Sequence, residues 1–457
     1  MKYISTRGGS QPLDFTGVLM AGLAPDGGLY VPETWPRLPA GMAGKTYQET
    51  AEAVLSLLAP DIPVDDLKAL LADTYTPRPD GFSTQEVTPL KKLDNQLSVL
   101  ELFHGPTIAF KDVALQFLGR LFDHTLRKSE KSITILGATS GDTGSAAIEG
   151  CRHAAGAEIF ILYPDGRTSD VQRRQMTTVD APNVHTIAIQ GSFDDCQAIV
   201  KKCFNDSEFR ARTALSAVNS INWARIAAQI VYYVHTAYKY REPVTFVVPT
   251  GNFGNVYAAY AARAMGAPVA RLVVASNRND ILSRFLQTGS MTARTVEPSL
   301  SPSMDIQVSS NFERLLFEAV GRDGKRVEAF MDAFAAQGHY EVPPAAMKSI
   351  RDVFIGGTCD DDQTLAAIKQ AQNSYGYLLD PHTAVGFAVY DRLKDSLGPS
   401  VLIATAHPAK FPDAVERATG MRPALPPHLA DLFDRSEHYD VLPADAQAVQ
   451  AFILGKI

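Results

Sequence analysis

Cysteine is scarce in this sequence, and no spacing pairs the few cysteines present. Cys151, Cys196, Cys203 and Cys359 are scattered and form no Cys-x-x-Cys motif, so neither a disulfide framework nor a zinc site is predicted, and we expect no bound metal. No stretch approaches the roughly 20 apolar residues of a membrane span. The first nine residues also lack a long apolar segment, which argues against a signal peptide. We therefore expect a cytoplasmic protein.

A basic tract is absent as well. The net charge is −7, which argues against nucleic acid or an anionic membrane as the main partner. With 46% hydrophobic and 20% charged residues, the composition is typical of a soluble globular protein. A chain of 457 residues is longer than one hydrophobic core usually serves, so two or three domains are predicted.

Changes of pattern along the chain predict three units. The Gly- and Pro-rich start, two helical patterns and a turn-rich linker form a small N-terminal unit, residues 1–84. From residue 85, short apolar runs alternate with helical segments, as in an α/β fold. We divide this part into lobes at 85–225 and 226–457, the second with helical insertions and C-terminal helices. The predicted strands span residues 98–102, 133–136, 158–163, 184–189, 245–248, 271–275 and 401–404.

A lysine opens a predicted helix in the segment Glu101–Asp112. Apolar residues recur at helical spacing directly after Lys111. The positive end of the helix dipole disfavours a second positive charge, and the apolar residues before the lysine would desolvate its ammonium. Both effects favour the neutral amine, which can attack a carbonyl and hold it as a Schiff base. The alternative is a surface lysine paired with Asp112.

Two glycine-rich loops each follow an apolar strand and precede a helix. The first spans Gly137–Gly144 and the second spans Thr250–Asn255. Such loops direct backbone N–H groups and a helix N-terminus at one point, which suits a carboxylate or a phosphate. The first loop lacks the Gly-Lys-Ser/Thr of a Walker A motif and the GxGxxG spacing of a dinucleotide site. Its alternative role is a tight turn that needs glycine for packing. Two such loops and the lysine predict two anionic groups near one reactive amine.

Near the C-terminus, small polar residues follow the last predicted strand. Thr405 lies directly after the apolar run of residues 401–404, and ligands of open α/β sheets bind at such strand ends. The alternative for Thr405 is a hydroxyl satisfied within the protein, and we expect His407 to cap or to pack.

Together these motifs resemble the threonine synthase family of pyridoxal-phosphate-dependent enzymes. The resemblance rests on His104–Asp112, Gly137–Gly144, Thr250–Asn255 and Ala404–Phe411, and the opening of the chain is similar to the longer bacterial and fungal branch. It implies the tryptophan-synthase-β-like fold, fold type II: two open α/β lobes with a small N-terminal unit.

The resemblance also implies which residues bind pyridoxal 5′-phosphate. Lys111 would form the Schiff base, and Thr405 would face the pyridine nitrogen. A neutral hydroxyl there makes the ring a weaker electron sink than an aspartate would, which agrees with elimination and replacement chemistry. Backbone amides of the second loop would hold the cofactor phosphate, namely those of Gly251, Asn252, Phe253, Gly254 and Asn255.

By the same resemblance, the first loop would bind the α-carboxylate of the substrate. Its residues are Thr139, Ser140, Gly141, Asp142 and Thr143. Many relatives of this fold have asparagine where this chain has Asp142, beside the 3′-oxygen of the cofactor. An ionised carboxylate would repel a phenolate there unless one of them is protonated.

The implied reaction converts O-phospho-L-homoserine and water to L-threonine and phosphate, the last step of threonine biosynthesis. Lys111 would be the general base. The substrate phosphate needs a second site, for which Ser220, Asn222 and Arg225 at a predicted helix start are the candidates. The alternative makes Asn222 a helix cap and Arg225 an exposed charge.

Two other functions stay open at this point. One is a fold-type-II serine or threonine dehydratase, which needs no second phosphate site. The other is a non-catalytic protein that binds the cofactor. The oligomeric state is also open.

Overall fold

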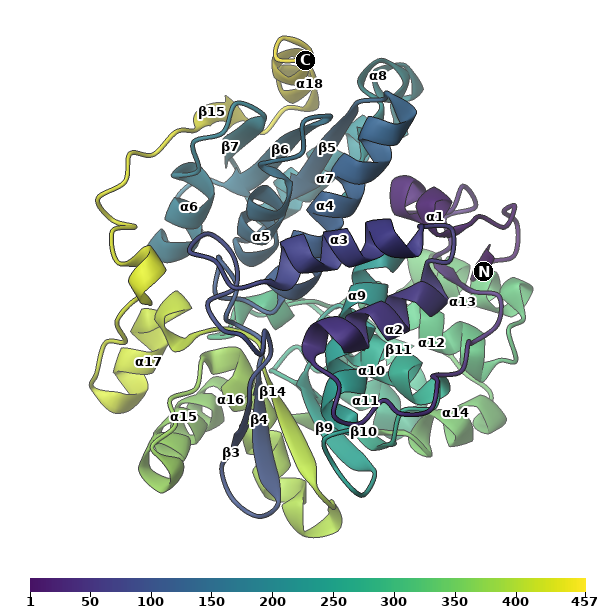
Figure 1. Ribbon diagram of the computed structural model, residues 1–457, viewed down its shortest axis with the longest axis vertical. Helices are drawn as coiled ribbons and strands as arrows, with labels where there is room; N and C mark the ends of the chain where they lie inside the picture. The colour runs from purple at the N-terminus through teal and green to yellow at the C-terminus, as the bar shows by residue number, and fades with distance from the viewer.

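Two open sheets with helices on both faces form most of the computed structural model, which describes residues 1–457 (Figure 1). The predicted α/β fold is confirmed. All seven predicted strands are present, and a helix begins at Lys111 as predicted. No helix combines the length and the apolar character that crossing a membrane requires.

The six-stranded sheet has the order β13-β10-β9-β14-β4-β3. All neighbouring strands are parallel except β3, which pairs with β4 in the antiparallel sense. The central strands are buried on both faces, so they read as apolar runs without alternation. The strands are β3 (Leu90–Lys92), β4 (Leu97–Glu101), β9 (Val244–Pro249), β10 (Val269–Ser276), β13 (Phe354–Thr358) and β14 (Ser400–Ala404).

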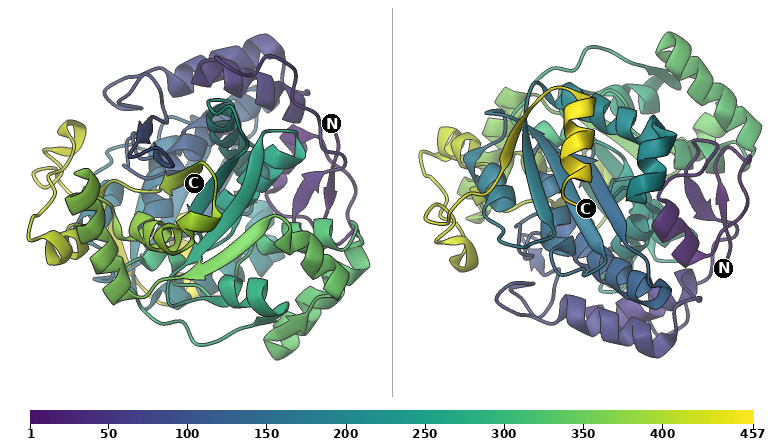
Figure 2. Two further views of the ribbon diagram at one scale, coloured as in Figure 1. Left: turned by 90° about the horizontal axis from the view of Figure 1, so that it is seen from below. Right: turned by 90° about the horizontal axis from the view of Figure 1, so that it is seen from above.

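The five-stranded sheet has the order β15-β7-β6-β5-β8 and is parallel throughout. One face packs on α7 and α18 and the other on α4 and α5; Figure 2 shows α18 lying across the sheet in the view from above. The strands are β5 (Ile133–Ala138), β6 (Ala157–Pro164), β7 (Val184–Gln190), β8 (Leu215–Ser216) and β15 (Asp440–Pro443).

The helices connect and cover these strands. Those between residues 111 and 264 are α4 (Lys111–Ser129), α5 (Asp142–Cys151), α6 (Asp170–Thr177), α7 (Phe193–Asn205), α8 (Ser207–Thr213), α9 (Trp223–Ala237) and α10 (Gly254–Ala264). Those that follow are α11 (Ile281–Thr288), α12 (Phe312–Ala319), α13 (Gly324–Gln337), α14 (Pro344–Arg351), α15 (Asp361–Tyr375), α16 (Pro381–Leu393), α17 (Pro412–Thr419) and α18 (Ala446–Leu454). Two short strands, β11 (Ser290–Thr292) and β12 (His339–Glu341), pair beside them.

The N-terminal region packs against this framework. It contains β1 (Tyr3–Ser5), α1 (Phe15–Ala21), β2 (Tyr30–Pro32), α2 (Tyr47–Leu58) and α3 (Val64–Tyr75). Its apolar side chains join those of α4, α9 and α10 in one cluster of 85 buried residues. This cluster is continuous with the core between the two sheets and is not a separate hydrophobic core.

Strand pairing crosses the lobe boundary predicted at residues 225 and 226. β4 belongs to the six-stranded sheet, because it pairs with β14, and β15 belongs to the five-stranded sheet, because it pairs with β7. The chain therefore enters one sheet, builds the other, returns and crosses again near its end. A division of the chain at a single point does not describe this arrangement.

Candidate active site

A tightly held turn precedes the lysine that opens α4. The carboxylate of Asp112 accepts hydrogen bonds from the backbone N and the Oγ1 of Thr107, at 2.9 and 2.6 Å. Ile108 has a φ of 53°, a left-handed conformation that is rare for a β-branched residue. The carboxylate of Asp112 thus bonds within the turn. Lys111 is buried, so the alternative of a surface Lys111–Asp112 pair is wrong.

The amine of Lys111 contacts a different carboxylate. Its Nζ lies 3.0 Å from Oδ2 of Asp142, the first residue of α5. Asp142 also accepts hydrogen bonds from Nε2 of Gln172 at 2.7 Å and from Oγ of Ser303 at 2.9 Å. The two helices lie side by side (Figure 1), so their N-terminal ends bring the amine and the carboxylate together.

Burial and charge set the protonation of this pair. Burial lowers the pKa of Lys111, and the charge of Asp142 opposes that shift. Burial alone would raise the pKa of Asp142, but Lys111 and the buried Lys410 outweigh it and bring this pKa well below its usual range. Asp142 is therefore ionised at neutral pH, and Lys111 reaches its neutral form more easily than an exposed lysine.

The first glycine loop connects β5 to α5. Oγ1 of Thr139 accepts hydrogen bonds from the backbone N of Gly141 and of Gly144, both at 2.9 Å. Gly141 has a φ of 140°, and a Cβ there would lie 2.5 Å from the Gln172 side chain. The N-cap residue of α5 is Gly141, which has no side chain, and Thr139 bonds to only one N–H group of the first turn, that of Gly144, so the N-terminus of α5 can still accept an anion. Ser140 is exposed.

The second glycine loop connects β9 to α10. Phe253 precedes the helix with a φ of 64°, and no side chain caps the helix. The loop is held from outside: the Gly251 carbonyl accepts a hydrogen bond from Oγ of Ser309 at 2.8 Å. Oδ1 of Asn255 accepts hydrogen bonds from the hydroxyls of two buried tyrosines, Tyr232 and Tyr233. The second loop therefore presents an uncapped helix N-terminus.

Thr405 follows β14 with its hydroxyl unpaired. Its backbone N donates to Oγ1 of Thr383 at 3.1 Å, but its own Oγ1 is buried and has no hydrogen-bond partner. A buried polar atom without a partner is costly. The alternative of a satisfied hydroxyl does not apply. His407 caps the short helix after it, because Nδ1 of His407 accepts a hydrogen bond from the backbone N of Ala409.

The three candidates for a second anion site differ in their surroundings. Asn222 caps α9 through Oδ1, and its Nδ2 donates to the Leu19 carbonyl, so the capping role applies to it. Oγ of Ser220 lies 3.4 Å from Oγ of Ser310. Arg225 is only 4% exposed, pairs with no carboxylate, and has no hydrogen-bond partner for Nη1. The alternative of an exposed charge does not apply to Arg225.

Burial lowers the pKa of Arg225 to about 10, and its charge contributes to the lowered pKa of Lys111. Even so, this guanidinium is charged at neutral pH. A buried, unpaired charge is expensive, so an anionic ligand in contact with it would be strongly stabilised.

The sequence did not predict the residues that hold Asp142. Lys410 lies in the Ala404–Phe411 motif, but nothing in its spacing indicated that its side chain turns back toward α5. Gln172 belongs to the capping box of α6, a motif that predicts a local role only. No sequence signal pointed to Ser303. All three contacts depend on tertiary packing.

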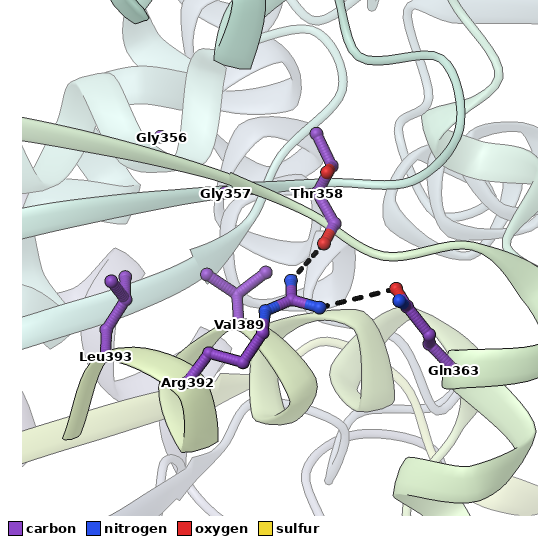
Figure 3. A pocket seen from close by; sticks show the side chains of 7 residues that line it. All are labelled: Gly356, Gly357, Thr358, Gln363, Val389, Arg392 and Leu393. Atoms are coloured by element: carbon purple, nitrogen blue, oxygen red, sulfur yellow. Dashed lines mark hydrogen bonds between the residues drawn. The ribbon is translucent and has the colours of Figure 1, made fainter.

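One surface hollow lies away from these residues, at the edge strand β13 (Figure 3). Arg392 donates to the carbonyl of Thr358 and to Oε1 of Gln363 there. Its guanidinium is therefore already paired, and none of the predicted site residues lines this hollow.

Models of three sequence families match the chain. The description "Threonine synthase N terminus" covers residues 2–75, "Pyridoxal-phosphate dependent enzyme" covers residues 83–340, and "Threonine synthase, C-terminal" covers residues 383–453. Together the three matches span most of the chain, including the lysine and both glycine loops.

Similar proteins match over the full length. Threonine synthase of Pseudomonas aeruginosa is 53% identical over 99% of this chain and 98% of its own. The crystal structure of pyridoxal-phosphate-bound threonine synthase from Brucella melitensis has a TM-score of 0.96 at 47% identity, covering 100% of this chain and 99% of that chain. Yeast threonine synthase has a TM-score of 0.94 at 39% identity, covering 100% and 98%.

Proposed function

This chain belongs to the threonine synthase family of pyridoxal-phosphate-dependent enzymes, and on that premise we propose that it converts O-phospho-L-homoserine and water to L-threonine and phosphate. Its cofactor is pyridoxal 5′-phosphate. The observation that carries the choice of substrate is the buried, unpaired guanidinium of Arg225. It provides an anion site in addition to the N-termini of α5 and α10.

Three features of the chain fit the cofactor. The unpaired Thr405 hydroxyl can donate to or accept from a pyridine nitrogen. The uncapped N-terminus of α10 suits a phosphate. The buried Lys111 amine, with its lowered pKa, suits covalent attachment to a carbonyl. We assign cofactor binding to Lys111, Thr405 and the loop Gly251–Asn255.

The substrate would be held by its two anionic ends. The N-terminus of α5, with residues 139–143, would bind the α-carboxylate, and Arg225 would bind the phosphate. Asn222 contributes by capping the helix that carries Arg225. Two fixed anion sites orient the carbon chain between them, so its reacting carbons face one amine.

Within this arrangement Lys111 moves the protons. When bound, the cofactor withdraws electrons from the substrate and so makes its C–H bonds more acidic. Lys111 would take the proton from Cα and transfer protons at the neighbouring carbons as phosphate leaves Cγ and water adds at Cβ. Its flexible four-carbon side chain lets one amine serve adjacent positions. Arg225 would stabilise the charge of the departing phosphate.

A paired end-point assay tests the proposed function. Purified holoenzyme is incubated with O-phospho-L-homoserine, and phosphate and amino acids are measured together, with Lys111→Ala in parallel. We expect equal amounts of phosphate and threonine, and neither product from the variant. Phosphate with 2-oxobutanoate would instead indicate a lyase that releases a keto acid. No turnover by a protein that binds the cofactor would support the non-catalytic alternative.

A further inference from the structure

Lys410 is a fully buried lysine that the mechanism above does not use. It ends the short 3-10 helix Pro408–Lys410, five positions after Thr405, and its side chain is 0% exposed. A buried ammonium without compensation is costly, so its partners indicate what it does.

Its Nζ joins three parts of the site. It donates to the Thr107 carbonyl at 2.8 Å and to Oε1 of Gln175 at 2.8 Å. It also lies 3.5 Å from Oδ1 of Asp142. Nε2 of Gln175 donates to the same Thr107 carbonyl at 3.1 Å. Lys410 thus connects the turn before Lys111 with α6 and with the start of α5.

The carboxylate of Asp142 is shared between two lysines. Lys111 contacts Oδ2 at 3.0 Å, and Lys410 approaches Oδ1 at 3.5 Å. The remaining contacts to the carboxylate, from Gln172 and Ser303, come from neutral groups. If the Lys111 amine is engaged elsewhere, Lys410 is the only cation that still contacts Asp142.

We propose that Lys410 is a positioning residue of this active site, which keeps the carboxylate of Asp142 neutralised while Lys111 is engaged with the cofactor. Its bond to the Thr107 carbonyl also holds the turn from which Lys111 projects. The role rests on the proposed function only in that Lys111 carries the cofactor. It explains why an ionised aspartate is tolerated beside a reactive amine, where an asparagine would carry no charge.

The electrostatic consequence can be measured on Lys111. The charged and titratable groups around the two lysines and Asp142 are Asp112 of α4, Arg225 of α9 and His382 of α16. Lys410 is one of the cations that hold down the pKa of Lys111. Its removal takes away that repulsion and leaves Asp142 to Lys111 alone, so the pKa of Lys111 should rise.

Competitive acetylation of the apoprotein between pH 7 and 10, read by peptide mass spectrometry, tests the inference. In Lys410→Met we expect the titration of Lys111 to shift up by about one pH unit, so that Lys111 is labelled about tenfold more slowly at pH 8. Lys410→Arg keeps the charge and should restore most of the wild-type titration. Lys394→Met, which removes an exposed lysine paired with Asp391, is the matched control and should leave it unchanged.

An unshifted Lys111 titration in a folded Lys410→Met protein would overturn the inference. If that variant does not fold, Gln175→Glu places a carboxylate against Lys410 without removing the lysine. The competing carboxylate should shift the Lys111 titration in the same direction, and no shift would again overturn the inference. Labelling of the apoprotein requires no turnover. Failure of the substrate assay and failure of this inference are therefore separate outcomes.

Discussion

The backbone amide of Phe110 donates a hydrogen bond to the carbonyl of Thr405 at 2.8 Å. Beside it, the amide of His407 donates to the carbonyl of Ile108 at 3.0 Å. These two bonds join the turn before Lys111 to the segment after β14. The reactive amine and the unpaired Thr405 hydroxyl are thus placed relative to each other by backbone contacts, which side-chain substitutions leave intact.

The Thr405 hydroxyl should therefore matter for the cofactor and not for the fold. In Thr405→Val we expect the affinity for pyridoxal phosphate to fall about fivefold, because one hydrogen bond contributes about 1 kcal/mol. The apoprotein should be at least as stable as the wild type, since the hydroxyl has no partner in the protein. Cofactor titration by absorbance and thermal unfolding of the apoprotein measure the two effects.

Thr405→Ser is the matched variant for that experiment, because it keeps the hydroxyl and removes only a methyl group. It should bind the cofactor within about twofold of the wild type. Weaker binding by Thr405→Ser than by Thr405→Val would contradict the role of the hydroxyl.

Local patterns in the sequence were sufficient to predict seven of the 15 strands, but not which strands pair with each other. The strand β4 was predicted from its apolar run, yet its neighbour β14 lies 303 positions later in the chain, and no local signal encodes that pairing. The strand β13 was missed because Gly356 and Gly357 interrupt its apolar pattern. Close packing leaves little room for a side chain at either glycine: a Cβ at Gly357 would lie 2.4 Å from Val389.

In the candidate site, too, some residues carry a local sequence signal and others are brought together only by tertiary packing. Lys111 and both loops carry local signals, since each needs glycine or a helix start. The partner of Lys111 carries no such local signal. The carboxylate of the neighbouring Asp112 bonds to the turn, whereas Asp142 is brought to Lys111 by the packing of α4 against α5. Adjacent positions on a helix point in different directions, so sequence proximity is a poor guide to contact.

That packing of α4 against α5 depends on two glycines. A Cβ at Gly119 would lie 1.7 Å from the carbonyl oxygen of Gly150, so no side chain fits between the helices. We expect Gly119→Ala to destabilise the apoprotein by about 3 kcal/mol or more. Because the helices also place Lys111 beside Asp142, the variant should bind the cofactor more weakly. Chemical denaturation and cofactor titration measure these effects.

Gly398→Ala is the control for the Gly119 variant, because a Cβ at Gly398 meets nothing within 4 Å. It should change stability by no more than about 0.5 kcal/mol. Equal stability of the two alanine variants would contradict the close helix contact.

Two buried arginines allow a matched test of the second anion site. Arg225 has no partner for Nη1. Arg314 donates to the carbonyls of Tyr30 and Ile221 at 2.9 and 2.6 Å. Arg225→Met should raise the KM for O-phospho-L-homoserine about 100-fold, because a charge-assisted phosphate contact contributes about 3 kcal/mol. Binding of pyridoxal phosphate should change little.

Substitution of these two arginines should have opposite effects on the stability of the apoprotein. Arg225→Met removes an uncompensated charge, so the apoprotein should keep or gain stability. Arg314→Met leaves two buried carbonyls without donors and should destabilise the apoprotein by about 3 kcal/mol. Steady-state kinetics and denaturation of both variants provide the comparison. An Arg225→Met enzyme with unchanged KM would contradict the phosphate site.

A partly buried carboxyl in α5, that of Glu149, predicts a specific dependence of stability on pH. Burial raises the pKa of Glu149 to about 7, although Arg152 lies 3.1 Å away. The folded protein therefore retains a proton that the unfolded chain has lost, and this group lowers stability as pH rises from about 4.5 to 7. Glu149→Gln should be more stable than the wild type by about 1–3 kcal/mol at pH 8, with a smaller difference at pH 5.

Urea denaturation of the apoproteins at both pH values measures this difference in stability. The control is Glu416→Gln, which changes an exposed carboxylate beside Arg422 and should alter stability little at either pH. A Glu149→Gln protein less stable than the wild type at pH 8 would show that the ion pair with Arg152 outweighs the cost of burial.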